Sequence, residues 1–347
     1  MRGRGFIAPD NFLADEGNRM NRREFITLVG GAAAAPSIPW LPAARAQEPG
    51  RTYRLGAVAA SPRDAPHHLA FFEELRRAGF IEGQNLTVDR RSYGLRAEQF
   101  DEHAAQLVKS KVDVILAGGD AAVSAAQRAA TVIPILALTD DMLGQGFVRS
   151  LAKPGGNTTG VSILASELDG KRQDLIMEAA PGLRRIAALA DRSTSTPPRL
   201  QALQDAARAR GVELLVHWVA RPEEIAPAID AAKASDAGAL NVLASSLLFN
   251  NRTIILDRVA ALRLPAVYQW PEMAEEGGLL GYGPRIVQLY RDVLARQLVA
   301  LLRGAKPADV PVEQPTKFEL VVNLQAAKAI GHEVPVAFLL RADKVIE

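Results

Sequence analysis

The sequence predicts an α/β protein made of two doubly wound parallel-sheet lobes, joined by a hinge that the chain crosses several times. Two observations carry this prediction. From residue 53 onward, short apolar runs alternate with longer amphipathic runs, which is typical of βαβ units around a buried parallel sheet. The same order of elements then occurs a second time, so we expect two similar lobes.

The first half of this pattern predicts four strands and three helices. Short continuous apolar runs are read as buried strands, and longer runs with a helical period as helices. The predicted strands are Tyr53–Ala59, Leu86–Arg91, Val112–Ala117 and Ile135–Leu138, and the helices are His67–Ala78, Arg96–Ser110 and Asp120–Ala130.

The second half repeats that order. Gly79 and Gly211 follow corresponding helices 132 positions apart, and Pro134 and Pro265 precede corresponding strands 131 positions apart. Glycine ends a helix and proline stops one before a strand. The predicted strands are Ile186–Ala190, Val212–Val219, Ala239–Leu243 and Ala266–Tyr268, and the helices are Pro198–Arg210, Pro222–Ala234 and Arg252–Leu262.

The C-terminal tail differs from either half. Gly277–Pro284 is too rich in glycine for a regular central strand, so we expect none there. A long amphipathic helix over Arg285–Arg303, an extended connector over Gly304–Pro315 and a strand over Phe318–Asn323 follow. A short helix over Leu324–Ile330 and an apolar run over Val334–Leu340 close the chain. We expect lobe I to hold residues 51–162 with about 283–310, and lobe II residues 163–282 with about 311–347.

The N-terminal segment reads as an export signal. The pair Arg22-Arg23 precedes a short uncharged run, Thr27–Ala35, and Ala44-Arg45-Ala46 forms a small-x-small cleavage site. This is the pattern of a secretory signal peptide. The alternative, a membrane anchor, is disfavoured because the run is too short for about 30 Å of hydrocarbon.

The arginine pair, followed by Glu24 and Phe25, resembles a twin-arginine signal. We therefore expect a signal peptide over residues 1–46, with 1–19 as an upstream extension, and a mature chain that begins near Gln47. That chain would be a soluble, unanchored monomer in the periplasm.

Composition excludes several classes of protein. The chain has 347 residues, 48% hydrophobic and 23% charged, with a net charge of +2, so it is neither disordered nor strongly basic. It has no cysteine, which excludes disulfides, thiolate metal sites and a lipid-modified Cys anchor. We expect no cofactor, no metal and no nucleic-acid partner.

Ligand contacts are expected where strands end, because open α/β sheets bind ligands beyond the carboxyl ends of their strands. Six loops meet this condition. They are Ala59-Ala60-Ser61-Pro62, Gly118-Gly119-Asp120, Thr139-Asp140-Asp141, Asp191-Arg192-Ser193, Ala244-Ser245-Ser246 and Tyr268-Gln269-Trp270.

Within these loops each candidate has a structural alternative. Gly119 lets the backbone approach a ligand, while Asp120 either contacts the ligand or caps the helix that it begins. Asp140 is either a solvated turn residue or the partner of a cationic amine in the ligand. Tyr268 and Trp270 either stack on the ligand or pack in the core or hinge.

Catalytic and nucleotide-binding motifs are missing from the sequence. Gly155–Gly160 lacks the P-loop and dinucleotide patterns, and its place between the lobes suits a hinge strand, with Asn157 and Thr158 within reach of the cleft. The five histidines are scattered without metal-like spacing. We therefore expect a binding protein and not an enzyme.

The whole predicted mature chain carries a family resemblance. The segments LRRAGFIEGQN (75–85), SLAKPGGNTTG (150–160), GGLLGYGP (277–284) and GAKPADVPVEQPTKFELVVNL (304–324) resemble the ABC-transporter substrate-binding family related to tryptophan- and tyrosine-binding proteins. The resemblance implies the type I periplasmic-binding-protein fold. It also implies a receptor that closes on a small solute and presents it to a permease and its ATPase.

Family pocket positions match unevenly. The resemblance implies ligand contacts at Ser61, Asn157, Thr158 and Tyr268. Family members usually have a hydroxyl where Asp120 stands and the sequence G-D-P where Thr139-Asp140-Asp141 stands. The lobe II loops also depart: family members usually end them in N-P and D-P, whereas this chain has Asp191-Arg192 and Ala244-Ser245. These departures disfavour an aromatic amino acid and leave a zwitterion or another small polar solute.

We therefore expect an extracytoplasmic solute-binding protein of an ABC importer, with Ser61, Gly119, Asp120, Asp140, Asn157, Thr158, Ser245 and Tyr268 as ligand contacts. Two alternatives stay open: an exported enzyme on the same scaffold, because fold does not dictate function, and a sensory receptor that signals instead of delivering its ligand to a permease.

Overall fold

The computed structural model describes residues 50–347, which belong to one compact unit of the chain. The predicted signal peptide, residues 1–46, lies outside the described residues. Two separate β-sheets, one of five strands and one of seven, organise the described chain. The prediction of an α/β fold with two parallel-sheet lobes is confirmed.

The first sheet, sheet A, consists of five parallel strands in the order β2-β1-β3-β4-β5. Nearly every residue of its central strands is buried, as continuous apolar runs predict for a parallel sheet covered on both faces. The strands are β1 (Tyr53–Val58), β2 (Leu86–Val88), β3 (Val114–Gly118), β4 (Ile135–Thr139) and β5 (Thr158–Ser162).

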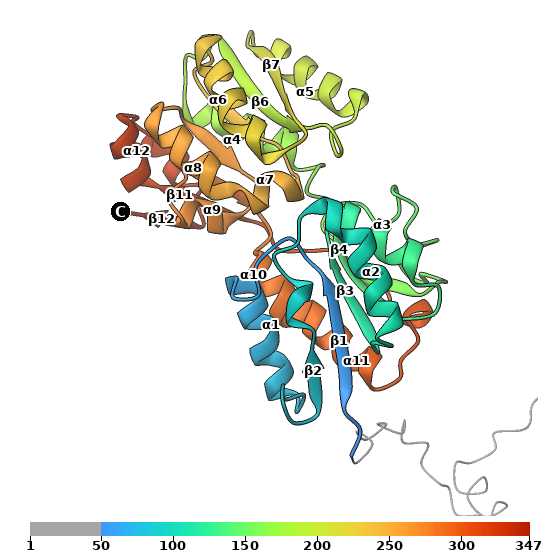
Figure 1. Cartoon of the computed structure of the whole chain (residues 1–347). Coiled ribbons are helices and arrows are strands. Elements are labelled where there is room, and N and C mark those ends of the chain that lie inside the picture. Colours follow the sequence, from blue (N-terminus) through green and yellow to red (C-terminus); the bar gives the residue numbers. More distant parts are fainter. Residues whose placement is uncertain (1–49) are drawn as a thin grey trace, which may run out of the picture. The chain divides into compact units, whose positions relative to one another are not determined.

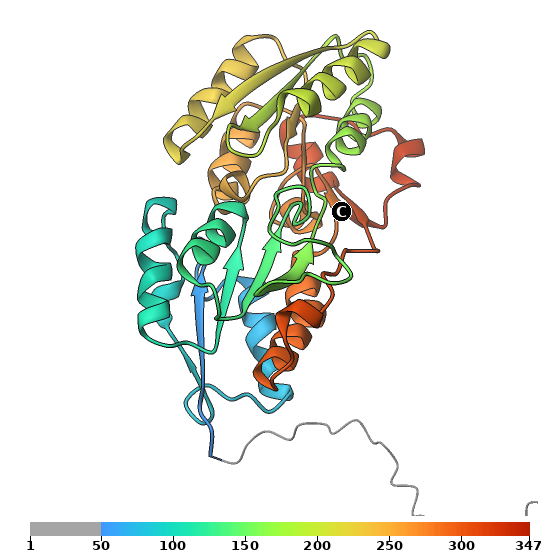
Figure 2. The ribbon, with the colours of Figure 1, turned by 90° about the vertical axis from the view of Figure 1, so that its right-hand side faces the viewer.

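Helices cover both faces of sheet A. The helices α2 (Phe100–Lys109) and α3 (Asp120–Ala129) pack together on one face, while α1 (Pro66–Arg77) packs against a helix from much later in the chain (Figure 1). That later helix runs through α10 (Ile286–Gln288), a π-helical segment η4 (Leu289–Leu294) and α11 (Ala295–Leu302). Figure 2 shows this orange segment beside the blue α1. Its extent agrees with the predicted helix, but its π-helical turn was not predicted.

The second sheet, sheet B, repeats the winding of sheet A and extends it. Its order is β12-β11-β10-β9-β8-β6-β7, so β7-β6-β8-β9-β10 corresponds to β2-β1-β3-β4-β5. One pair, β10 with β11, is antiparallel. The strands are β6 (Arg185–Asp191), β7 (Glu213–Val219), β8 (Leu240–Val242), β9 (Ala266–Tyr268), β10 (Leu280–Gly283), β11 (Glu319–Asn323) and β12 (Lys344–Ile346).

The helices around sheet B pack in pairs, α4 with α5 and α6 with α8. They are α4 (Asp169–Ala179), α5 (Pro197–Ala209), α6 (Ile225–Ala234), α7 (Ser246–Asn250), α8 (Arg252–Ala261), α9 (Pro271–Glu275), α12 (Leu324–Ile330) and α13 (Val336–Leu339). Short 3-10 turns lie at Arg90–Ser92, Ala97–Gln99, Pro222–Glu224 and Pro307–Asp309.

The chain passes between the two sheets three times. It leaves sheet A after β5, returns after β10, and leaves again after Glu313, which forms a parallel bridge with Val161 of β5. The expectation that the chain crosses between the lobes several times is therefore confirmed.

The prediction that Gly277–Pro284 contains no regular central strand is wrong. Strand β10 lies between β9 and β11 inside sheet B. A Cβ on Gly281 would lie 2.5 Å from the carbonyl oxygen of Trp270, and one on Gly283 would lie 2.2 Å from that of Gln269. The glycines are present because backbone packs directly against this strand, and this close approach outweighs their low strand propensity.

Candidate functional site

A cleft lies where the carboxyl ends of the strands of sheet A and sheet B meet. It encloses about 690 Å³ of space unoccupied by protein atoms, which includes open solvent. Its walls draw on five of the six predicted loops, and Thr194 stands just beyond the sixth. The strand-end rule therefore places this cleft correctly in the fold.

Five of the eight predicted contacts line the cleft. These are Ser61, Gly119, Asp120, Asp140 and Ser245. Each follows a strand within a few residues, four in the connecting loops and Asp120 at the first position of α3, so the sheet fixes the position of its backbone. Sheet A supplies the first four and sheet B the fifth.

The other three predicted residues lie elsewhere. The Asn157 side-chain amide donates to the carbonyl oxygens of Ala130 (2.7 Å) and Ile133 (2.9 Å). The Thr158 hydroxyl accepts from the Gln127 amide at 2.8 Å. Tyr268 is fully buried in β9, and burial raises the pKa of its phenol. None of the three lines the cleft in the described structure, so our proposals use the first five.

Two contacts join the lobes at the cleft. The Ser61 hydroxyl donates to Oδ1 of Asn250 at 2.9 Å. Gly119 has a φ of +90°, and a Cβ there would lie 2.4 Å from the Ser246 hydroxyl oxygen. Both the backbone conformation and the close approach of lobe II require glycine at this position.

Asp120 stands at the first position of α3 and faces the cleft. The alternative that it caps the helix is wrong, because Gly119 occupies the N-cap and no side chain supplies a capping bond there. Burial raises the pKa of the Asp120 carboxyl to about 6. The negative charges of Asp140, Asp141 and Asp191 act in the same direction, and a backbone hydrogen bond at Asp140 opposes them.

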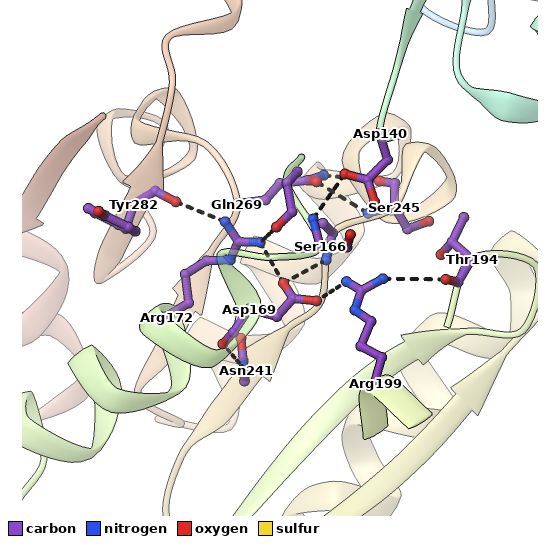
Figure 3. Close-up of polar contacts among 12 residues, drawn as sticks. Asp140, Ser166, Asp169, Arg172, Thr194, Arg199, Asn241, Ser245, Gln269 and Tyr282 are labelled. Carbon is purple, nitrogen blue, oxygen red and sulfur yellow. Dashed lines mark hydrogen bonds and ion pairs between the residues drawn. The ribbon is translucent and has the colours of Figure 1, made fainter. Parts of the chain in front are cut away.

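Asp140 links the cleft to a buried ionic network below it (Figure 3). Its Oδ1 accepts a 2.9 Å hydrogen bond from the backbone N–H of Ser166 in the first crossing. Below lies Asp169, fully buried, which pairs with Arg172 and Arg199. Arg172 also donates to the carbonyl oxygens of Ala165 and Tyr282. One guanidinium thus ties the first interlobe crossing to β10, just before the second.

Ser245 is already engaged within lobe II. Its hydroxyl donates to Oδ2 of Asp191 at 2.6 Å and accepts from the backbone N–H of Leu248, which caps α7. The side chain of Gln269 bonds both the N–H and the carbonyl of Ser245. These bonds fix the backbone and side chain of Ser245 where it lines the cleft.

Aromatic rings form walls that the sequence did not reveal. His67 of α1 lies 4.7 Å from Tyr290 and 6.1 Å from Phe249, measured between ring centroids, and Phe249 lies 5.8 Å from Trp270. Of these, only Trp270 was foreseen as a stacking candidate. The others come from helices remote in sequence, and no local motif marks them.

His67 and His68 are uncharged at neutral pH. Burial lowers the pKa of His67 to about 3 and that of His68 to about 4. The Nδ1 of His68 lies 2.8 Å from the carbonyl oxygen of Pro62, and a carbonyl only accepts. The Nδ1 therefore carries the proton, and the Nε2 of His68 is left as an acceptor.

Residues 50–347 contain neither a grouped metal-ligand set nor a membrane-spanning helix. No three His, Asp or Glu side chains in that range are grouped to hold a metal ion. No helix in the same range is both long and apolar enough to span a bilayer.

The sequence of this chain is similar to those of known proteins. A family model described as ABC transporter substrate binding protein matches residues 67–346. The chain is 25% identical over 267 residues to a protein of Clostridioides difficile named tyrosine-binding protein, a match covering 75% of each chain.

Two solved structures share the fold. One is a conserved domain protein from Vibrio cholerae, with a TM-score of 0.75 and 22% identity. The other is an ABC domain from Streptococcus pneumonia in complex with L-Trp, with a TM-score of 0.71 and 23% identity. Each match covers 85% of this chain and 100% of the other.

Proposed function

Because this chain belongs to the family of ABC transporter substrate-binding proteins, we propose that it is the extracytoplasmic solute-binding component of an ABC importer. It takes up a small polar or amino-acid-like solute in the cleft between its lobes and presents it to a permease driven by an ATPase. The predicted signal peptide supports export to the periplasm. The relative named tyrosine-binding protein and the fold shared with an L-Trp complex support a solute of amino-acid size.

The observation that carries this proposal is the composition of the cleft wall. Loops at the strand ends of both sheets line it, so a bound solute contacts both lobes at once. Three crossings connect the sheets, and such connections act as hinges. We propose that residues 51–162 with 283–310 move as one lobe against residues 163–282 with 311–347.

Closure follows from differential affinity. A solute that contacts Asp120 in lobe I and Trp270 in lobe II makes both contacts only when the lobes are close. It therefore binds the closed form more tightly and shifts the equilibrium toward it. The Ser61–Asn250 hydrogen bond stabilises the same form.

Trp270 is a built-in probe for this proposal because it lines the cleft. In a chain of residues 45–347 carrying Trp218→Phe, Trp270 is the only tryptophan. We expect one or more compounds from a set of amino acids, amines, small carboxylates and aromatic acids to change its fluorescence saturably. Small-angle scattering should show a smaller radius of gyration with the same compound, which should be recovered chemically unchanged.

The matched control is Trp270→Phe with Trp218 retained, in which the fluorescence response should disappear. Failure of the whole set to change either fluorescence or scattering would contradict the proposal. Conversion of the compound during incubation would point to an enzyme instead.

A further inference from the structure

We propose that the cleft is built for a small organic cation, a primary or secondary ammonium on an apolar body, and that it does not require a carboxylate on the solute. This inference rests on the proposed solute-binding function and names the chemical class of its ligand. Three features of the cleft carry it: the sign of its charged groups, its unpartnered polar atoms and its aromatic walls.

The charged side chains that line the cleft are all acidic. Asp120 and Asp140 line it, and no Lys or Arg does so within the described chain. An ammonium placed between two carboxylates forms charge-assisted hydrogen bonds. A solute carboxylate in the same place would meet like charges without a partner cation, which disfavours it.

The nearest buried cations are already committed. Arg172 and Arg199 pair with Asp169, and Arg172 also donates to two backbone carbonyls. Another carboxylate, Asp191, lies behind Ser245 and bonds its hydroxyl. The two guanidinium groups share the one carboxylate of Asp169; burial lowers the pKa of both arginines, and the negative charge of Asp140 opposes that shift. Because neither Arg172 nor Arg199 lines the cleft in the described chain, a carboxylate ligand there would not contact them directly.

Cations near the rim are likewise paired. Arg252 forms an ion pair with Glu276 at 2.5 Å, and Arg63 forms one with Glu82 at 2.7 Å. Each guanidinium also lies over a phenylalanine ring, Phe249 or Phe72. Neither Arg252 nor Arg63 lines the cleft in the part of the chain that is described.

Buried polar atoms in the cleft wall await a partner. The Nε2 of His68, the hydroxyl of Thr139 and the Nε1 of Trp270 have no hydrogen-bond partner among residues 50–347, although these residues are 0%, 1% and 3% exposed. Leaving such groups unpaired is costly, which indicates that a ligand or water fills the role. The Nε2 of His68 accepts a hydrogen bond from an N–H donor and the Thr139 hydroxyl can accept or donate one, whereas the Nε1–H of Trp270 only donates and pairs with an acceptor such as water, not with an ammonium.

The aromatic walls suit the same ligand. Phe249, Trp270 and Tyr290 line the cleft and offer ring faces that attract a cation and apolar surface that covers its body. A hydrophilic zwitterion would place its ammonium against the ring faces but would leave its carboxylate without a cationic partner. The combination of paired acids, acceptors and rings fits an amine with an apolar body.

Two triads of compounds test this inference by calorimetry at pH 7.5. Phenethylamine, L-phenylalanine and 3-phenylpropanoate share one body, and pentylamine, L-norleucine and hexanoate share another. Within a triad only the charged groups change. We expect the better-fitting amine to bind at least ten-fold more tightly than its amino acid, and the acid not to bind.

Two variants distinguish a direct contact between Asp120 and the amine from the longer-range electrostatic effect of the nearby negative charges. Asp120→Asn should weaken amine binding at least ten-fold, whereas Asp141→Asn, which removes an equal charge just outside the cleft wall, should weaken it less than three-fold. Circular dichroism and thermal melting verify that both variants fold.

Tighter binding of an amino acid or acid than of its amine would overturn the inference and leave the binding function intact. Binding by none of the six compounds, or equal effects of the two variants, would overturn it as well. The fluorescence and scattering experiment with the wider set decides the binding function separately.

Discussion

The hydroxyl of Ser61 donates a 2.9 Å hydrogen bond to Oδ1 of Asn250, joining residues 189 positions apart across the cleft. In the closure that we propose, this bond forms only while the lobes are close, so it would stabilise the form that binds solute. A neutral hydrogen bond contributes about 0.5–1.5 kcal/mol, a small but measurable bias on closure.

We expect Ser61→Ala to weaken solute binding about two- to ten-fold without changing the unfolding midpoint, because the lost bond favours closure and not folding. Titration calorimetry measures the change. Asn250→Ala should not add to it in the double variant, and Thr131→Ala, at an exposed position, serves as control. Additive effects of the two variants would mean that the residues act independently.

Amine binding should weaken as the pH falls through 6. The pKa of Asp120 is raised to about 6, so the carboxylate is charged at pH 7.5 and mostly neutral at pH 5. An ammonium prefers the charged form, and its affinity should therefore fall about ten-fold from pH 7 to pH 5.

His67 and His68 stay neutral over this range because burial lowers their pKa values to about 3 and 4. Calorimetry with phenethylamine at pH 5, 6, 7 and 7.5 measures the profile. Asp120→Asn should make it nearly flat, and an equally steep profile in that variant would assign the titration to another group.

Asp169 should be among the most sensitive positions for stability. Its carboxylate is fully buried, pairs with Arg172 and Arg199, and accepts from the backbone N–H of Ala244. Asp169→Asn leaves two guanidinium groups without their anion, and breaking a buried pair costs about 3–5 kcal/mol.

Urea unfolding measures this loss. The matched control is Asp205→Asn, which removes the exposed partner of Arg208 and should cost well under 1 kcal/mol. A loss below 1 kcal/mol at Asp169 would show that water replaces the pair.

Gly281→Ala should destabilise lobe II and disturb Trp270. The added Cβ would lie 2.5 Å from the Trp270 carbonyl oxygen and 2.8 Å from Cα of Pro271, and backbone atoms yield less readily than side chains. We expect a loss of about 1–3 kcal/mol, the usual range for overpacking.

Gly156→Ala is the control, because no atom lies within 4 Å of its added Cβ. Urea unfolding and Trp270 fluorescence compare the two variants. Equal stability would mean that the strand shifts to accommodate a methyl group at no cost.

The helices and strands were predictable where the buried residues are apolar and form a regular pattern along the chain. The strands β3, β4 and β9 are almost entirely apolar, and β1 departs from this only at the exposed Arg54. The structure places all four within a few residues of their predicted bounds. Helix α4 was missed because its buried face carries Asp169, Arg172 and Gln173. An amphipathic pattern assumes that buried residues are apolar, and this helix violates that assumption.

The sequence predicted only those parts of the site that lie directly after strand ends. Ser61, Gly119, Asp120, Asp140 and Ser245 each follow a strand, and the rule for open sheets brings them together. Tyr268 is the last residue of β9 and points into the core, whereas Gln269 and Trp270, just beyond the strand, reach the cleft. The orientation of a side chain at a strand end depends on pairing within the sheet, which the sequence alone does not specify.

The sequence alone determined the α/β class, the repeated order of elements and the loops that carry the cleft, because these follow from local periodicity and the position of each loop after a strand. Tertiary structure decided which groups face one another: His67 against Tyr290, Ser61 against Asn250, and Arg172 against the first interlobe crossing and β10. Such contacts join residues far apart in the chain, so they depend on how helices and sheets pack and leave no trace in local periodicity.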